Sequence, residues 1–120
     1  MDEKIKSFKD LKIWQRGMEI VKDVYELTRQ FPKEETYGLM SQMRRCAVLM
    51  PSNVAEGFKR YHNKEYKQFL YITLGSSAEL ETQLIISKNL SYITSVQLDP
   101  VIEKLDVLGR MITSLMRKLN

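Results

Sequence analysis

The segment QMRRCAVLMPSNVAEGFKR, residues 42–60, constrains the fold of this 120-residue chain more than any other. It holds five consecutive apolar residues, Cys46 to Met50, and Pro51 follows them directly. Five successive residues point in every direction around a helix, and a helix that is apolar all round is normally buried on more than one side. We therefore expect a helix here that packs in its own bundle and also against something beyond it.

Pro51 lies inside this helical pattern. It has no N–H for the carbonyl of Ala47 and its ring crowds that turn, so an interior proline costs about 3 kcal/mol or more and usually kinks the helix. The apolar spacing nevertheless keeps its phase from Met43 through Met50 to Val54. The sequence favours one continuous helix with a kink at Pro51. The alternative is a break, with Pro51 opening a new short helix.

Apolar residues three and four positions apart form stripes that predict four helices around one core. The first stripe is Leu11, Trp14, Met18, Val21, Tyr25 and Thr28. The second is Leu39, Met43, Cys46 or Ala47, Met50 and Val54. The third is Tyr66, Phe69, Leu70, Thr73, Ser77, Leu80, Leu84 and Ser87, extended by Ile72, Ile85 and Ile86. The fourth is Leu98, Val101, Ile102, Leu105, Leu108, Ile112, Leu115, Met116 and Leu119.

Residues that start and stop helices separate these stripes. Asp10 is expected to cap the first helix and Pro32 to end it. Glu34 and Glu35 suit the start of the second helix, and Gly57 is expected to begin the turn that follows it. The prediction is an all-α fold, an antiparallel up-down-up-down four-helix bundle that forms a single domain over residues 1–120. Its helices are placed near residues 10–30, 35–57, 64–90 and 97–118.

The third helix is thin at its centre, where Gly75, two serines and Ala78 follow one another. Glycine costs about 1 kcal/mol in a helix interior relative to alanine, and small residues let a neighbouring helix approach closely. A phosphate-binding loop is the alternative, but no strand precedes the segment and the P-loop lysine is missing. The segment therefore predicts a close helix crossing.

Composition sets limits on location and partners. Lys and Arg exceed Asp and Glu by four, which permits an anionic partner such as nucleic acid. The single cysteine, Cys46, excludes an internal disulfide and suits a reducing cytosol. No apolar run approaches the roughly 20 residues that cross a membrane, and residues 1–9 hold no apolar signal core. The expected location is the cytoplasm, without membrane contact.

Residues that carry catalytic chemistry are scarce. His62 is the only histidine and Cys46 the only cysteine, so one chain cannot build a His/Cys metal cluster. A Ser-His-Asp arrangement would need His62, which we expect in an exposed turn. Glu79 and Glu81 are two residues apart on a helix and point to different faces. We expect no enzymatic activity, no cofactor and no metal. The alternative is a site assembled from several chains of a pentamer.

Three stretches closely resemble one known family. They are FKDLKIWQRG (8–17), FPKEETYGLMSQMRRCAVLMPSNVAEGFKR (31–60) and the run from Phe69 to Leu84. The family is that of the 23S rRNA intervening-sequence proteins, four-helix bundles of which some are encoded inside insertions in bacterial large-subunit rRNA genes. Its most specific motif, P-S-N-(V/I)-A-E-G, occupies residues 51–57 here. Cys46 stands where an alanine is usual, and Leu49 where a serine is.

The resemblance implies a bacterial homopentamer of bundles around a central axis. The family is also similar to the accessory proteins of diversity-generating retroelements, which form pentameric barrels and bind a reverse transcriptase and its RNA. The resemblance therefore implies three kinds of partner for this chain: further copies of itself, RNA, and a reverse transcriptase or another protein. Residues near the apolar run are the predicted subunit contacts: Cys46, Leu49, Met50, Pro51, Asn53, Glu56 and Glu79.

Six cations are the predicted nucleic-acid contacts: Arg44, Arg45, Lys59, Arg60, Lys64 and Lys67. The last four flank a turn where only Glu65 opposes them, and phosphate contacts there would bind RNA. Three aromatic residues interleave with these cations and are predicted to stack on bases: Phe58, Tyr61 and Tyr66.

Simpler interpretations of these residues stay open. The four cations near the turn are equally explained as an ordinary solvated face. Arg44 or Arg45 is expected to pair with Glu56 or Glu79, within or between subunits, because buried charges need partners. Two functions follow from the sequence: an oligomeric RNA-binding protein, or an oligomeric scaffold that docks a polymerase, a reverse transcriptase or another protein.

Overall fold

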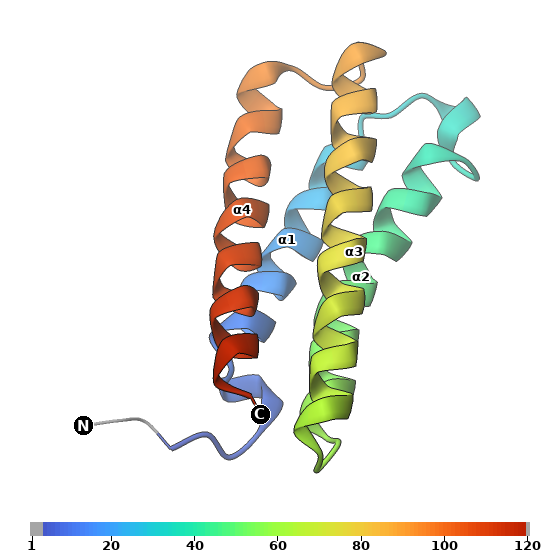
Figure 1. The fold of residues 1–120 in the computed structure, drawn as a ribbon. Coiled ribbons are helices and arrows are strands. Elements are labelled where there is room, and N and C mark those ends of the chain that lie inside the picture. The colour runs from blue at the N-terminus through green and yellow to red at the C-terminus, as the bar shows by residue number, and fades with distance from the viewer. Residues whose placement is uncertain (1–3, 120) are drawn as a thin grey trace.

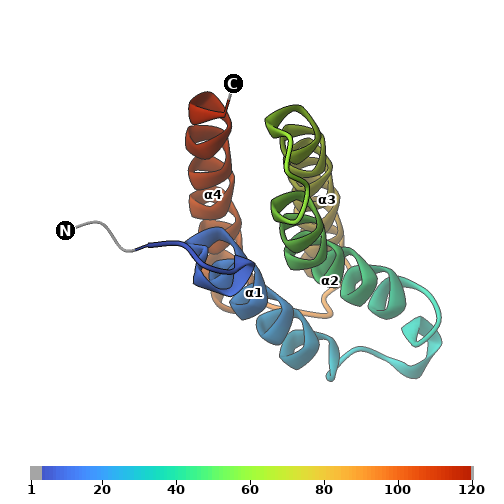
Figure 2. The ribbon, with the colours of Figure 1, turned by 90° about the horizontal axis from the view of Figure 1, so that it is seen from below.

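The computed structural model describes residues 4–119, which form four α-helices and two short 3₁₀ turns. The helices are α1 (Lys12–Thr28), α2 (Leu39–Phe58), α3 (Asn63–Asn89) and α4 (Ser95–Lys118), and the turns are η1 (Phe8–Asp10) and η2 (Lys33–Glu35). Residues 4–119 contain no strand, so the all-α prediction is confirmed. Successive helices run in opposite directions along one long axis (Figure 1). Seen from below, α1 lies beside α2 and α4, and α3 lies between α2 and α4 (Figure 2).

Three of the predicted core stripes are confirmed. On α3 the buried positions of the predicted stripe are Tyr66, Leu70, Thr73, Ser77, Leu80, Leu84 and Ser87. On α2 the buried apolar side chains are Met43, Cys46, Ala47, Met50, Pro51 and Val54. On α4 they are Leu98, Val101, Leu105, Leu108, Ile112 and Met116. The buried residues of all four helices join in one apolar cluster, which is the core of the bundle.

The predicted stripe on α1 is wrong by one residue. The buried positions are Ile13, Gly17, Ile20, Val24 and Thr28. Met18, which the prediction placed in the core, is 44% exposed. Two overlapping stripes with helical spacing exist on this helix, and the large aromatic side chains favoured the wrong one. The correct stripe contains Gly17, and a Cβ there would lie 3.3 Å from the Cβ of Pro51, so α1 and α2 meet closely at this pair.

Helix α2 is continuous across Pro51, as the sequence predicts, so the alternative of a break there is wrong. The kink stays a prediction. Gly57 was expected in the turn but is buried inside α2. A Cβ added to Gly57 would lie 2.8 Å from the Cβ of Phe69 and 3.0 Å from Cδ1 of Tyr66. The missing side chain therefore allows α2 and α3 to approach, and residues 59–62 make the turn instead.

The first residues of three helices differ from the predicted ones, because the capping hydrogen bonds lie at other positions in the sequence than expected. The Asp10 carboxylate accepts hydrogen bonds from the backbone N–H groups of Lys6 and Ser7. It completes a capping box of η1 with the N-cap Ser7, and α1 begins only at Lys12. Helix α2 begins at Leu39, whose N–H donates to the Glu35 carboxylate at 3.0 Å. Helix α4 begins two residues early, at Ser95, because a capping box formed by its N-cap threonine satisfies its first turn.

The outward side of α3 is apolar as well as its core side. Ile72, Ile85 and Ile86, predicted to extend the core, are 41–52% exposed. Gly75 is exposed, and a Cβ added to it would have no atom within 4 Å. Within the described chain, no helix makes the predicted crossing at this glycine. None of the described helices is both long and apolar enough to cross a membrane.

Candidate nucleic-acid interface

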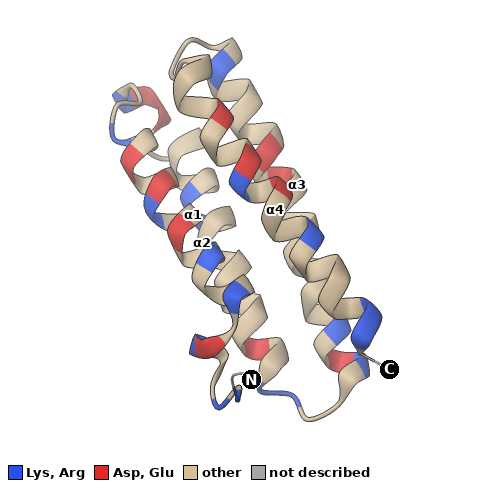
Figure 3. Ribbon diagram, turned by 90° about the vertical axis from the view of Figure 1, so that its left-hand side faces the viewer, with Lys and Arg blue, Asp and Glu red and all other residues tan. Residues whose placement is uncertain are grey.

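The helix directions collect cations at one end of the bundle. The end of α2, the start of α3 and the end of α4 lie together there (Figure 1). These segments carry Lys59, Arg60, Lys64, Lys67, Arg117 and Lys118. Basic residues cluster at this end near the C-terminus, whereas acidic and basic residues alternate toward the other end (Figure 3). We call these six residues the basic end; the sequence prediction contained four of them and missed the two at the end of α4.

The predicted cations near the turn mostly face solvent. Lys59, Arg60 and Lys64 are exposed, and Lys67 is half-buried. The Arg60 guanidinium lies 3.9 Å from the Glu65 carboxylate and 5.2 Å from the centre of the Phe69 ring. Arg60 is therefore partly oriented by its neighbours, whereas the three lysines form no ion pair within residues 4–119.

Only one of the three predicted stacking aromatics is accessible. Tyr61 is 94% exposed in the turn. Tyr66 is buried, its hydroxyl has no hydrogen-bond partner among residues 4–119, and desolvation raises its pKa. Phe58 is half-buried and packs edge-on against Tyr66 with ring centres 6.3 Å apart. The prediction that Tyr66 stacks on a base is wrong, because this ring fills the gap between α2 and α3.

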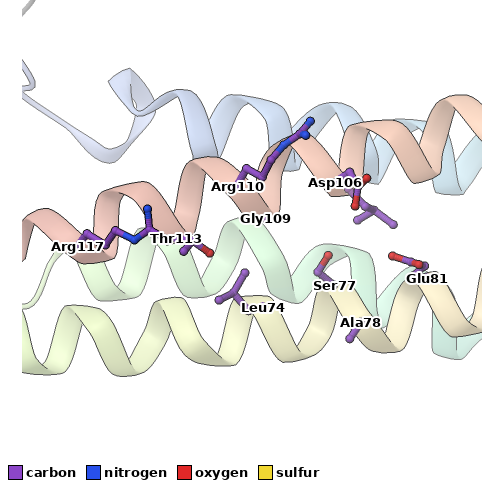
Figure 4. A pocket seen from close by; sticks show the side chains of 10 residues that line it. Leu74, Ser77, Ala78, Glu81, Asp106, Gly109, Arg110, Thr113 and Arg117 are labelled. Carbon is purple, nitrogen blue, oxygen red and sulfur yellow. The ribbon is translucent and has the colours of Figure 1, made fainter.

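A groove between α3 and α4 extends the basic end along the bundle. Two cavities of about 360 and 630 Å³ lie in it, and they share Leu74, Thr113 and Arg117. The two ends of the groove carry opposite charges. Arg117 and Arg110 lie toward one end, and Asp106 and Glu81 lie toward the other (Figure 4). The sequence prediction missed Arg110 and Arg117, although their spacing of two helical turns places them on one face of α4.

Arg44 is held by the end of α1. Its Nε donates to the Thr28 hydroxyl at 2.8 Å, and Nη2 donates to the Tyr25 carbonyl at 3.3 Å. The guanidinium also lies 4.4 Å from the centre of the Tyr25 ring. The Tyr25 carbonyl belongs to the last turn of α1, where carbonyls lack helical partners, so Arg44 caps this helix. The expected Arg–Glu pair is absent within residues 4–119, whose ion pairs are Arg60–Glu65 and Lys104–Asp23.

Replacing Arg44 by alanine is expected to lower the free energy of unfolding by about 1–2 kcal/mol, because it removes charged hydrogen bonds from a half-buried site. Arg45 is the matched control: it is one residue away and exposed, so Arg45→Ala should change stability by less than about 0.5 kcal/mol. Urea denaturation of both variants measures the difference. Equal stabilities would show that Arg44 does not cap α1.

The predicted subunit-contact residues divide between core and surface. Cys46, Met50 and Pro51 are buried in this chain. Three others, Leu49, Glu56 and Glu79, are exposed. Asn53 is half-buried, and its side chain donates to the backbone carbonyl of its own helix four residues earlier, at 2.8 Å. The buried members of this set therefore belong to the core, whereas Leu49 and the two acidic residues face outward.

Cys46 is a packing residue. Its thiol lies 3.0 Å from the Ser76 carbonyl oxygen, to which it donates. Burial, with the neighbouring Glu79 carboxylate, raises the pKa of the thiol from 9.0 to about 12. The thiolate that would act as a nucleophile or metal ligand is therefore scarce at neutral pH. Among residues 4–119, no group of three or more His, Cys, Asp or Glu side chains is placed to hold a metal ion.

Comparison with known families now decides the relationship. The family described as 23S rRNA-intervening sequence protein matches residues 9–114. The chain belongs to this family. The match includes all of the motif at residues 51–57, whose proline and glycine set the close contacts of α2 with α1 and α3. No curated protein matches the sequence.

A solved structure supports the fold of this 23S rRNA-intervening sequence protein. It is the crystal structure of a protein of unknown function from the S23 ribosomal protein family of Bacteroides thetaiotaomicron. The two chains superpose with a TM-score of 0.80 and share 16% sequence identity. The similarity covers 87% of this chain and 97% of the other. At this identity the comparison establishes the fold alone.

Proposed function

We propose that the protein is a non-enzymatic, cytoplasmic homo-oligomer, a ring of five chains, that binds structured RNA through the phosphates. The observation that supports RNA binding is the basic end. Its cations come from three helix ends, and the exposed ones make no contribution to the apolar core. Cations gathered without a packing role are the usual footprint of a phosphate-binding surface.

A ring would strengthen this binding. Each chain carries a surplus of four positive charges, so five chains carry twenty. Symmetry would repeat the basic end five times around one rim, and several weak contacts to one RNA then act together. Each phosphate contact adds about 0.7 to 0.9 to the slope of log affinity against log salt concentration.

The proposed subunit contact is the outward side of α2 and α3. The side chains of Val48 and Leu49 on α2 are 40% and 38% exposed. Those of Ile72 and Ile86 on α3 are 52% and 41% exposed. Exposed apolar side chains in one neighbourhood of a soluble protein mark an interaction surface. Gly75 supports a helix crossing here, since its cost in the helix brings no close packing inside the chain.

Charge reversal tests RNA binding. The double variant Lys59→Glu/Arg60→Glu should weaken the affinity for a structured RNA several-fold and lower the salt slope, because two phosphate contacts become repulsive. Filter binding at four salt concentrations measures both quantities. The matched control is Lys33→Glu/Lys88→Glu, which makes the same change of charge on exposed lysines at the opposite end of the bundle.

Equal affinities and slopes for the two double variants would remove the basic end from RNA binding. The same exposed α2–α3 surface also supports the alternative function, a scaffold that docks a polymerase, a reverse transcriptase or another protein. Recovery of such a partner after complete ribonuclease treatment, with no salt-dependent RNA binding, would favour the scaffold.

A further inference from the structure

The lower part of the α3–α4 groove combines cations with an accessible aromatic ring. The smaller cavity, of about 360 Å³, is lined by Lys67, Tyr71, Leu74, Thr113, Met116 and Arg117. Its volume falls in the range of about 300–1,000 Å³ that is typical of ligand pockets. This site lies within the basic end and had no place in the sequence prediction beyond Lys67.

Tyr71 is the unusual member of the site. Its side chain is 63% exposed although it lies two turns inside α3, which packs against α2 and α4. Lys67 precedes it by one helical turn on the same side of α3, and Arg117 reaches the site from α4. Neither Lys67 nor Arg117 forms an ion pair within residues 4–119, so both charges are available to a ligand.

The walls of the site suit a flat apolar ring. Leu74 is half-buried and Met116 is buried, and both belong to or pack against the apolar core. Farther along the groove, Glu81 and Asp106 place two carboxylates around the larger cavity (Figure 4). These carboxylates repel phosphate, so the end of the groove that holds Arg117 is the favourable one for an anionic chain.

We propose that this site binds one unpaired base of an RNA. The base stacks on Tyr71 against the walls formed by Leu74 and Met116, and Lys67 and Arg117 contact the phosphates on either side of it. A paired base has no free face for such stacking, so the ligand is a nucleotide in a loop, bulge or single strand. This inference rests on the proposed RNA-binding function and names the part of the RNA that is recognised.

The test compares two RNA probes: a single-stranded oligoadenylate of 12 nucleotides and a fully paired duplex with the same number of phosphates. Tyr71→Leu should weaken binding of the single strand about tenfold, since stacking of one base on an aromatic side chain contributes an effect of this size. Binding of the duplex should stay within about twofold, and Tyr71→Phe should retain the affinity for both probes because its ring stacks equally well.

Tyr37→Leu is the matched control. Tyr37 is 96% exposed and lies at the opposite end of the bundle, so its removal should leave both affinities unchanged. Arg117→Ala should lower the salt slope for the single strand by about 0.7, the contribution of one phosphate contact. Thermal unfolding of every variant confirms the fold.

Each result has a distinct meaning. If the wild-type protein binds neither probe with salt dependence, the proposed function fails, and this inference fails with it. If the wild type binds but Tyr71→Leu has unchanged affinity for the single strand, RNA binding stands and the Tyr71 site is wrong. Competition by adenosine monophosphate as strong as that of the oligonucleotide would overturn it too, because the site would then be one for free nucleotides.

Discussion

Replacing Gly57 by valine is expected to lower the free energy of unfolding by about 3 kcal/mol, the upper part of the range for overpacked cores. Any side chain at this position meets the Cβ of Phe69 at 2.8 Å and the ring of Tyr66 at 3.0 Å. The first of these atoms is tied to the backbone of α3, so relief requires the two helices to separate. Gly57→Ala should show the same effect at a smaller size, and urea denaturation measures both.

Gly109→Ala is the matched control for Gly57→Ala. Gly109 also lies inside a helix, but a Cβ there meets only the end of the Leu74 side chain, at the ordinary distance of 4.0 Å. This variant should gain up to about 1 kcal/mol from the better helix propensity of alanine. Equal effects of the two substitutions would show that Gly57 has no special role in the contact between α2 and α3.

The sequence predicted the helices well and the details of their contacts less well. Spacing alone located the buried faces of α2, α3 and α4, because each carries one clear stripe of core positions. On α1 it failed, since the true stripe includes Gly17, which counts as neither apolar nor large. Only the position of Pro51 on the neighbouring helix gives this glycine its meaning, and that position is a property of the folded chain.

The candidate site was predictable only where it is local in sequence. The cations on either side of Tyr61 are close together in the sequence, so a single turn between two helices is enough to bring them to one end of the bundle. Arg117 joins the basic end, and Arg110 lines the groove beside it, because α4 returns along α3. No local pattern of charge contains that information. Tyr66 and Arg44 show the converse: both fit a binding surface by type, but packing assigns one to a helix contact and the other to a cap.

The outward glycine of α3 offers a test of the oligomer that does not weaken the chain. Gly75→Leu should stabilise the helix of an isolated chain, because leucine has a better helix propensity than glycine. A Cβ added at this position has no atom of the described chain within 4 Å, so the new side chain meets no steric conflict there. In the proposed ring, the same side chain would hold the neighbouring helix away. We expect light scattering to give about five times the chain mass of 14.1 kDa for the wild type and 14.1 kDa for Gly75→Leu.

A control variant separates this surface from the rest of the molecule. Val96→Leu enlarges a side chain that is 83% exposed at the start of α4, and it should leave the oligomer intact. Ile72→Glu, which places a charge on the proposed contact, should dissociate the oligomer as Gly75→Leu does. A monomeric wild type would reject the ring. A pentamer that persists in both α3 variants would move the subunit contact away from the α2–α3 surface, because neither bulk nor charge there would then oppose assembly.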